Sequence, residues 1–434
     1  MPVTKIRNYR WFIVTLLFFA TTINYIDRQI IGLLKPILEK EFSWTETDFA
    51  HIMMCFSASY AVGLLSLGWI IDKIGTKQGY AITIICWSIA GMLHAFAKSV
   101  SGFSIARVGL GLSEAGNYPA AMKTVAEWFP DKERSLATGI FNMGTSMGVV
   151  VALLIVPLIL QLYGWQEVFL ITGGLGFIWL IFWRRFYTVP SKQERLTGDE
   201  YALIINGQEE EKETMLHQQR VQWIKLFRFP QTWAYITGKG LIDPIYWFFL
   251  FWLPSYFSST FSLDLKKPSL QLMIIYAATT LGSFGGGYFS SWLIKKGWPV
   301  LKARKMALLL FAILEITVMF VRFADTAWAA VALISIAVAV HQAWATNIFT
   351  TASDMFPKEA VSSVVGIGGM AGAVGGILFP ILVGNLLDTY KTAGNITAGY
   401  NILFTICGFT YLVAWTIIHL LTRKVQKVKL SELV

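Results

Sequence analysis

Ionisable residues lie within long apolar stretches of the N-terminal half of the sequence, notably Asp27, Arg28, Arg107 and Glu114. A charge at the centre of a membrane-spanning helix costs roughly 2.5–3.5 kcal/mol or more, so each is a candidate for function. Arg107 and Glu114 are seven residues apart, which places them on nearly one helix face but about 10 Å from each other. Each therefore needs a partner on another helix, or water.

Glu114 has the chemistry expected of a proton carrier. Removal from water favours the neutral, protonated form of a carboxyl group. Such a group can take up a proton on one side of a membrane and release it on the other. The alternative is a static ion pair that ties two helices together.

Asp27 and Arg28 diverge by about 100° on a helix, and Asn24 precedes both by about one turn. We expect Asp27 to pair with Arg107 as a second protonatable group or a gate, although pairing with Arg28 stays open. Arg28 would then face a central cavity. Because a guanidinium group binds a carboxylate through two parallel hydrogen bonds, we predict that Arg28 holds an anionic substrate. The alternative is a network that joins helices without touching substrate.

A second group of charges lies in the C-terminal half. Lys239 and Asp243 are four residues apart and can pair along one helix, either as a structural contact or as an inner gate. Pro244 frees a backbone carbonyl and predicts a local kink. Glu315 has no obvious partner in the sequence.

A polyhydroxylated anion also needs hydrogen-bonding side chains and an apolar or aromatic surface. His341, Trp344 and Asn347 fall on one helix face, although a histidine packed against a neighbouring helix is the alternative for His341. The full set of predicted substrate-binding residues beside Arg28 is Tyr25, Tyr60, Tyr246, Trp247, His341, Gln342, Trp344 and Asn347.

The composition indicates that a membrane surrounds these residues. The chain has 434 residues, of which 55% are hydrophobic and 14% charged, against about 25% charged in soluble domains. Spanning helices need about 20 apolar residues. Twelve segments qualify: 11–35, 46–71, 78–97, 101–123, 135–160, 166–187, 231–257, 268–294, 304–322, 327–350, 360–386 and 398–421. We therefore predict an all-α polytopic membrane protein.

The longest polar stretch divides the chain into three parts. These are an N-terminal six-helix bundle (1–187), a cytoplasmic linker (188–230) and a C-terminal six-helix bundle with a short tail (231–434). Thr197 is a candidate cap for a short linker helix. Most of the 36 Lys and Arg residues fall on the side that carries both termini, which predicts cytoplasmic termini. The net charge of +10 is thereby explained, so no nucleic-acid partner is predicted.

The two halves share an internal repeat. Residues 129–148 and 356–375 align without gaps and share a Phe-Pro pair and a Gly-Ile pair. Both copies start on the same side of the membrane, so the repeat is parallel. Parallel six-helix repeats are a known transporter design with the substrate site near the membrane midplane.

Enzyme chemistry has no candidate residues. The sequence holds no metal-spaced His/Asp cluster, no Ser/His/Asp set and no phosphate-binding loop, so we predict neither an enzyme nor a metal or organic cofactor. Cys55, Cys86 and Cys407 lie in apolar segments and are interpreted as core residues.

The segment from Gly68 to Lys77, with Asp72 and Lys73, resembles the loop signature of the major facilitator superfamily. Residues 24–28 and 107–120 resemble its anion:cation symporter branch. Residues 127–135, 201–209 and 341–343 resemble bacterial hexuronate transporters.

The resemblance implies a twelve-helix fold and proton-coupled import of a sugar-acid anion across a bacterial inner membrane by alternating access. It also implies that Glu114 carries the coupling proton, that Arg28 binds substrate and that a contact of Asp72 latches the outward-open state. On physical grounds, Asp72 could pair with a positive helix N-terminus, or simply cap a loop.

The expected partners are a small organic anion and the lipid bilayer, and the expected functional unit is a monomer. Proton symport or exchange of another organic anion, such as an aldonate, aldarate or dicarboxylate, is the first alternative. A non-transporting membrane receptor of the same fold is the second.

Overall fold

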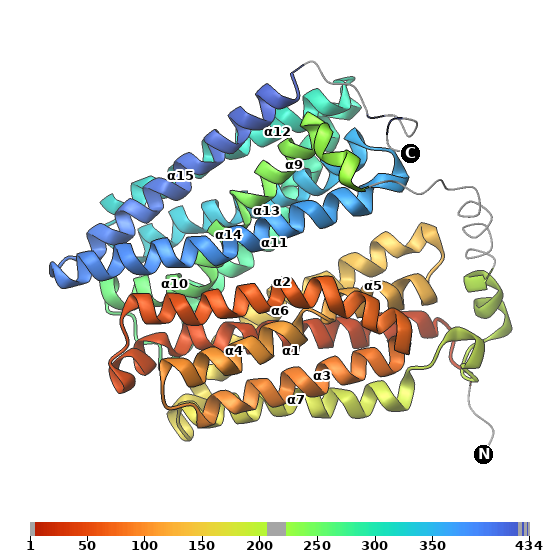
Figure 1. The fold of residues 1–434 in the computed structure, drawn as a ribbon, viewed down its shortest axis with the longest axis horizontal. Helices are drawn as coiled ribbons and strands as arrows, with labels where there is room; N and C mark the ends of the chain where they lie inside the picture. Colours follow the sequence, from red (N-terminus) through yellow and green to blue (C-terminus); the bar gives the residue numbers. More distant parts are fainter. Residues whose placement is uncertain (1–4, 206–222, 424–427, 429–431, 433–434) are drawn as a thin grey trace. The chain divides into compact units, whose positions relative to one another are not determined.

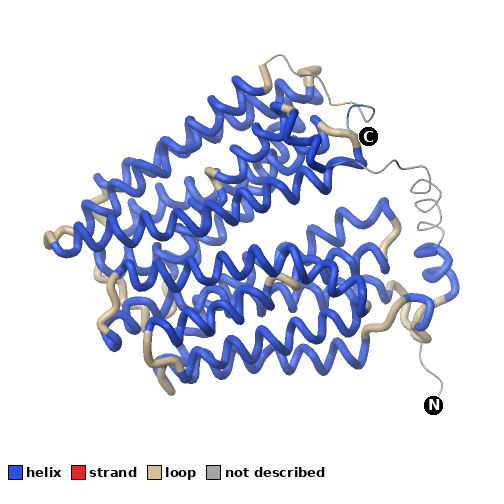
Figure 2. The backbone as a smooth tube through the Cα atoms, viewed as in Figure 1, coloured by secondary structure: helices blue, strands red, loops and turns tan. Residues whose placement is uncertain are grey.

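The computed structural model describes residues 5–205, 223–423, 428 and 432, without the side chains of residues 131, 132, 135, 223, 358, 359 and 362. Every regular element in these ranges is a helix (Figures 1 and 2). Residues 206–222 of the predicted linker, including the end of the segment 201–209, lie outside the described residues.

Seven long helices precede the linker. They are α1 (Tyr9–Phe42), α2 (Glu46–Ile74), α3 (Thr76–Leu93), α4 (Val100–Glu114), α5 (Asn117–Trp128), α6 (Asp131–Leu162) and α7 (Trp165–Phe186). Short 3₁₀ turns are η1 (His94–Phe96) and η2 (Pro190–Lys192). Helices α3 and α7 pack side by side (Figure 1).

The second group of helices follows the linker. It comprises η3 (Trp223–Arg228), α9 (Pro230–Gly240), α10 (Asp243–Phe261), α11 (Leu270–Lys295), α12 (Val300–Glu315), η4 (Ile316–Phe323), α13 (Ala327–Met355), α14 (Lys358–Thr392) and α15 (Ile396–Leu421). Helix α13 packs along α11 and α12, and α15 packs along α12 and η4.

Nine helices within the described ranges are long and apolar enough to cross a membrane. Helices α4 with α5, α9 with α10, and α11 occupy the other three predicted segments without meeting the same measure. The multi-span, all-helical character is therefore confirmed, and the count of twelve stays a prediction.

The chain forms two compact units. The first contains Met1–Ile31 and Cys55–Gln218, and the second contains Gly32–Met54 and Gln219–Val434. The units follow the two predicted halves of the sequence except at residues 32–54. This stretch, the end of α1 and the start of α2, packs with the C-terminal helices instead.

Two prolines explain where helices break. The ring of a proline collides with the carbonyl four residues earlier in a helix and removes one hydrogen bond. For Pro244 that carbonyl belongs to Gly240, where α9 ends before α10 starts at Asp243. The kink predicted from Pro244 is confirmed. Pro119 has the same relation to Ala115, which lies in the break between α4 and α5.

The internal repeat is visible in the packing of the glycines. A methyl group added at Gly148 of α6 would collide with Tyr25 and the carbonyl oxygen of Thr22 on α1. At Gly375, the equivalent position on α14, it would collide with Pro244 and the carbonyl oxygen of Gly240. Small residues allow this close approach of helix backbones in a membrane. In the first unit α6 therefore packs against the part of α1 that holds Tyr25. In the second unit α14 packs against the break that holds Pro244.

The linker is anchored by Glu200. Its two carboxylate oxygens accept hydrogen bonds from the backbone amides of Tyr9 (3.0 Å) and Arg10 (3.1 Å), the first two residues of α1. The Arg10 guanidinium lies 2.9 Å from Glu200 and 2.8 Å from Glu133 of α6. Thr197 accepts from the amide of Glu200 at 3.4 Å, as predicted for a helix cap. The start of the linker thus holds the N-terminus of α1.

Candidate functional site

Arg28 of α1 and Glu114 of α4 form a buried ion pair. The Nε and Nη2 atoms of Arg28 donate to the same oxygen, Glu114 Oε2, at 3.1 and 3.0 Å. The other oxygen, Oε1, is buried and has no hydrogen-bond partner in the described structure. Nη2 also approaches Asn24 Oδ1 at 3.5 Å, one helical turn earlier. One carboxylate oxygen therefore occupies two donors of the guanidinium fork.

Aromatic rings surround the Arg28 guanidinium. Its central carbon lies 4.7 Å from the ring centroids of both Tyr25 and Tyr60, and 5.3 Å from that of Phe56. Tyr25 and Tyr60 are half-buried, so part of each ring stays accessible beside the cation. Cation–π contacts of this kind stabilise a desolvated guanidinium. Three predicted substrate-binding residues, Arg28, Tyr25 and Tyr60, therefore lie together, and Phe56 joins them without having been singled out in the sequence.

The expected ion pair between Asp27 and Arg107 does not form. Asp27 is buried with a weak contact to the Thr172 hydroxyl, and neither carboxylate oxygen has a partner in hydrogen-bonding geometry. Arg107 is fully buried, and among the described residues none of its three nitrogen atoms has a hydrogen-bond partner. Because adjacent residues diverge by about 100° on a helix, α1 directs Arg28 to Glu114 of α4 while Asp27 lies against Thr172 of α7.

Tyr246, His341 and Tyr411 form a polar cluster in the second unit. His341 Nδ1 shares a 2.7 Å hydrogen bond with the hydroxyl of Tyr411 on α15. Its ring stacks on that of Tyr246 with centroids 4.7 Å apart. His341 is buried and Tyr246 half-buried. In this conformation His341 is therefore bonded to a neighbouring helix, which is the alternative given for it above. Its partner Tyr411 was not singled out from the sequence.

Trp344 and Asn347 use their polar atoms to join helices. Trp344 Nε1 donates to the carbonyl of Gly238 on α9 at 3.2 Å. Asn347 Nδ2 donates to the carbonyls of Gly286 and Ala343, each at 2.9 Å. These donors hold helices together in this conformation, so substrate contact by the two residues stays a prediction.

Gln342 and Trp247 are half-buried and keep part of their surface accessible. Trp247 packs beside Gly376 of α14, where an added methyl group would lie 3.2 Å from the indole ring. Both residues therefore remain candidates for contact with a sugar.

Lys239 and Asp243 form the predicted ion pair, with Nζ 2.6 Å from Oδ2. The pair spans the break between α9 and α10, and the ammonium lies 4.4 Å from the ring centroid of Phe349. Gly372 of α14 makes room for it, because an added methyl group would lie 2.6 Å from Asp243 Oδ2. The pair therefore spans a break and contacts the glycine-rich face of α14.

Asp72 pairs with a side chain rather than with a helix N-terminus. Its Oδ1 atom lies 2.8 Å from Lys123 Nζ of α5, which also donates to the carbonyl of Ile71 at 3.2 Å. The ammonium of Lys73 lies 5.1 Å from the ring centroid of Trp69. In this conformation Asp72 therefore meets Lys123, which is long enough to reach back from α5, and its contact with a helix N-terminus stays a prediction.

The buried ion pair of Arg28 and Glu114 can exchange partners. No three His, Cys, Asp or Glu side chains gather at metal-binding distance in the described ranges. A guanidinium group held by one carboxylate can be transferred to another carboxylate if the first becomes neutral. Half-buried tyrosine rings beside the guanidinium provide a surface for the apolar face of a sugar.

A profile described as Major Facilitator Superfamily matches residues 17–380. The chain belongs to this superfamily. The hexuronate transporter of Escherichia coli K12 is 31% identical over 96% of this chain and 95% of its own length. The galacturonate transporter of Dickeya chrysanthemi is 32% identical over 72% of this chain and 90% of its own length.

A solved structure has the same fold. A bacterial homologue of the human lysosomal transporter Spinster, inward-facing and occupied, superposes with a TM-score of 0.78 at 16% identity, covering 99% of both chains. Superfamily members are transporters, so the chain is a multi-span membrane transporter and not an enzyme.

Proposed function

We propose that this transporter imports a sugar-acid anion together with a proton, and that the anion is a hexuronate such as galacturonate or glucuronate. The buried Arg28–Glu114 pair carries the proposal. The two sugar-acid transporters that match most of the chain support the substrate class.

Coupling follows from competition for one cation. In the described conformation Glu114 occupies Arg28, so a substrate carboxylate has no free guanidinium fork. A proton on Glu114 neutralises that carboxylate and releases Arg28 to the substrate. Proton and anion therefore favour each other's binding.

The exchange also keeps the charge of the buried site constant. Arg28 faces one negative charge before the exchange, on Glu114, and one afterwards, on the substrate. An uncompensated buried charge is strongly destabilising, so a loaded site without the proton is disfavoured. One proton per monovalent anion makes transport electroneutral, and an inside-negative potential then does not oppose import.

Asp27 is the second candidate for proton binding, and Arg107 the second buried cation. Both are buried without an ion pair in the described structure. We infer that Asp27 is a second site of proton binding. The positive charge of Arg107 favours the ionised form of Glu114 when no substrate is bound. Protons are the coupling ion, and no cofactor is required.

The sugar hydroxyls need hydrogen-bonding partners beyond Arg28. Gln342, His341, Tyr246 and Trp247 supply amide, imidazole, phenol and indole groups on α13 and α10. Tyr25 and Tyr60 supply the aromatic surface next to the cation.

We place both termini in the cytoplasm of a bacterium, with twelve spans in its inner membrane and a functional monomer. Asp72 then lies on the cytoplasmic side, where we infer that a contact other than its present ion pair with Lys123 latches the outward-open state. Lys239 and Asp243 form an inner gate.

The test is uptake of radiolabelled galacturonate and glucuronate into proteoliposomes with and without an inward proton gradient. Wild type should accumulate one of them with the gradient. Glu114→Gln should lose accumulation but keep counterflow exchange, because its neutral amide leaves Arg28 free. Glu194→Gln, an exposed linker variant, is the control.

Two outcomes contradict the proposal. If neither sugar acid enters, the hexuronate assignment fails, and aldonates, aldarates and dicarboxylates follow as substrates to test. If uptake is insensitive to the gradient, the proton coupling fails.

A further inference from the structure

In the part of the first unit that the structure describes, three buried polar residues lack the hydrogen bonds that burial normally requires. Neither oxygen of Asp27, none of the three side-chain nitrogens of Arg107 and not Nε2 of His94 has a hydrogen-bond partner among the described residues. None of the three residues is more than 3% exposed. Almost all buried polar atoms in proteins bond to protein or to ordered water. These six atoms therefore need partners.

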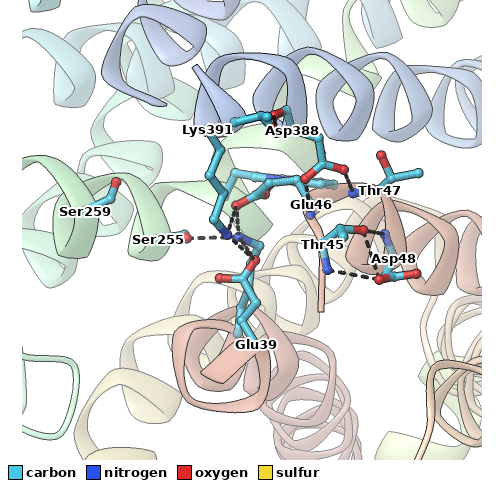
Figure 3. A network of polar contacts seen from close by, with 12 residues as sticks. Glu39, Thr45, Glu46, Thr47, Asp48, Ser255, Ser259, Asp388 and Lys391 are labelled. Atoms are coloured by element: carbon cyan, nitrogen blue, oxygen red, sulfur yellow. Dashed lines mark hydrogen bonds and ion pairs between the residues drawn. The ribbon is translucent and has the colours of Figure 1, made fainter. Parts of the chain in front are cut away.

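Buried charges of the second unit show the usual arrangement. Asp388 of α14 accepts hydrogen bonds from the amides of Glu46 and Thr47, each at 2.7 Å (Figure 3). The fully buried ammonium of Lys35 lies 2.8 Å from a carboxylate oxygen of Glu46. A buried charge without such contacts is costly. Arg107 is as deeply buried as Lys35, yet it makes no such contact with the described residues.

The hydrogen bonds of His94 decide which ring nitrogen can accept a proton. Nδ1 lies 2.8 Å from the carbonyl oxygen of Ala90 and 3.1 Å from that of Gly91, both on α3. Because carbonyl oxygens only accept, Nδ1 carries the hydrogen of the neutral ring. Nε2 is then the acceptor and points away from the backbone of α3. The ring stacks on Phe169 of α7, with centroids 5.0 Å apart, which holds its orientation.

Along α4 these groups follow one another from the α3–α4 connection toward Glu114. The His94 ring lies beside that of Phe103, near the start of α4, with centroids 6.0 Å apart. Arg107 is about 6 Å further along α4, and Glu114 about 10 Å beyond Arg107. The charge of Arg107 acts on both His94 and Glu114. Arg107 therefore connects the level of His94 with that of the Arg28–Glu114 pair.

Helix α7 gives the same order for Asp27. Thr172, whose hydroxyl approaches Asp27, follows Phe169 by about one turn. Arg107 and Thr172 are each the eighth residue of their helix, and the predicted topology starts both helices on one side of the membrane. Asp27 and Arg107 thus lie at similar depth, and their charges act on each other. Because the two charges offset one another, this level does not repel a proton as an isolated guanidinium would.

Water is the partner that suits all of these atoms. The guanidinium group only donates, the carboxylate only accepts, and Nε2 of the neutral His94 accepts. A buried water makes about three hydrogen bonds, so about two water molecules would satisfy the six atoms. Oε1 of Glu114, which is also buried without a partner in the described structure, extends the series toward the proposed site of coupling.

We propose that His94, Arg107 and Asp27 surround a chain of buried water molecules, and that His94 passes the coupling proton into this chain. Nε2 takes a proton from water on the side of the α3–α4 connection, and the ring becomes an imidazolium that keeps its Nδ1 bond to Ala90. The same proton leaves Nε2 for the chain, moves to Asp27 and then to Oε1 of Glu114. The inference rests on the proposed function, which supplies the proton and the outer location of that connection.

The first experiment detects the water chain without any substrate. X-ray radiolysis of the purified protein forms hydroxyl radicals from buried as well as bulk water, and mass spectrometry locates the oxidised side chains. Phe169, which stacks on His94, should be oxidised several-fold faster than Phe129. The two are matched, because both are at most 2% exposed and Phe129 packs against Trp11. Equal oxidation rates would overturn the water chain.

The second experiment removes the proton relay. His94→Phe keeps a ring against Phe169 but has no nitrogen to carry a proton. We expect gradient-driven uptake to slow about tenfold, less than the factor of about 100 typical of a proton-transfer group, because water can partly replace the imidazole. The Kd and counterflow exchange should not change, since neither depends on the rate of net proton movement. His51→Phe, at an exposed histidine of α2, is the control.

A solvent isotope effect separates slow proton transfer from loss of packing. In D2O the uptake rate of His94→Phe should fall further than that of wild type. His94→Gln, whose amide lies near the place of Nε2 but cannot carry a proton, should show the same isotope effect.

Each remaining outcome decides between the relay and the proposed function. Loss of counterflow in both His94 variants would show that His94 is structural and would refute the relay. Full-speed uptake by His94→Phe beside a gradient-sensitive wild type would refute the relay and leave the proposed function intact. A wild type that ignores the gradient would refute both.

Discussion

Arg28 carries one positive charge, and either Glu114 or the substrate carboxylate can pair with it. The structure shows it with Glu114, and the proposed mechanism transfers it to the substrate. The sequence singled out both residues because charges are costly in apolar helices. Their pairing was not predicted, since helical periodicity places residues on faces of one helix but does not say which helices are neighbours.

Replacing Arg28 by lysine tests the need for a guanidinium fork. Lysine keeps the charge but presents a point charge instead of two parallel donors. Loss of one charge-assisted hydrogen bond is worth about 1.5–3 kcal/mol. We therefore expect the KM for the sugar acid to rise about 10- to 150-fold, measured as initial uptake in proteoliposomes. Arg322→Lys, at an exposed arginine, should leave KM unchanged, and an unaltered KM in Arg28→Lys would refute carboxylate binding by Arg28.

The elements place these residues through breaks and caps. Pro119 ends α4 just after Glu114, and Pro244 ends α9 just after Lys239, so both functional candidates lie next to a helix break. The break at Pro244 could be predicted from the sequence because Lys239 and Asp243 had already drawn attention to that segment. The capping of α1 by Glu200 could not, because the two segments are 190 residues apart and only the folded chain brings them together.

Removing the cap on α1 should lower stability. Glu200→Ala loses two hydrogen bonds to backbone amides and one ion pair with Arg10. We expect a loss of about 2 kcal/mol and a thermal midpoint lower by about 2 °C in detergent solution. Glu194→Ala, at an exposed linker position, should unfold like wild type. Equal midpoints for the two variants would show that the linker does not stabilise α1.

At the scale of the whole molecule, the all-helical, repeated organisation follows from composition and from the shared segments 129–148 and 356–375. The glycine contacts at Gly148 and Gly375 show why the repeat is kept, since each lets a long helix approach its partner. Residues 32–54 depart from the two-half scheme. The sequence divides halves at the polar linker and carries no signal for contacts such as that between Asp388 and α2.

The proposed orientation predicts the location of both termini. A green fluorescent protein fused to the C-terminus should fluoresce, and alkaline phosphatase fused there should be inactive. Alkaline phosphatase fused after Lys98, between η1 and α4, should be active because that connection faces outward. The reverse pattern would invert the proposed orientation.

The account depends most on the claim that a proton on Glu114 frees Arg28 for the substrate. Its direct measurement is the Kd of galacturonate or glucuronate for purified protein between pH 5 and 9. If one proton is taken up with each anion, the wild-type Kd should rise about tenfold per pH unit above the titration of Glu114. Glu114→Gln should bind tightly at every pH. A Kd in Glu114→Gln that keeps the wild-type pH dependence would contradict the claim.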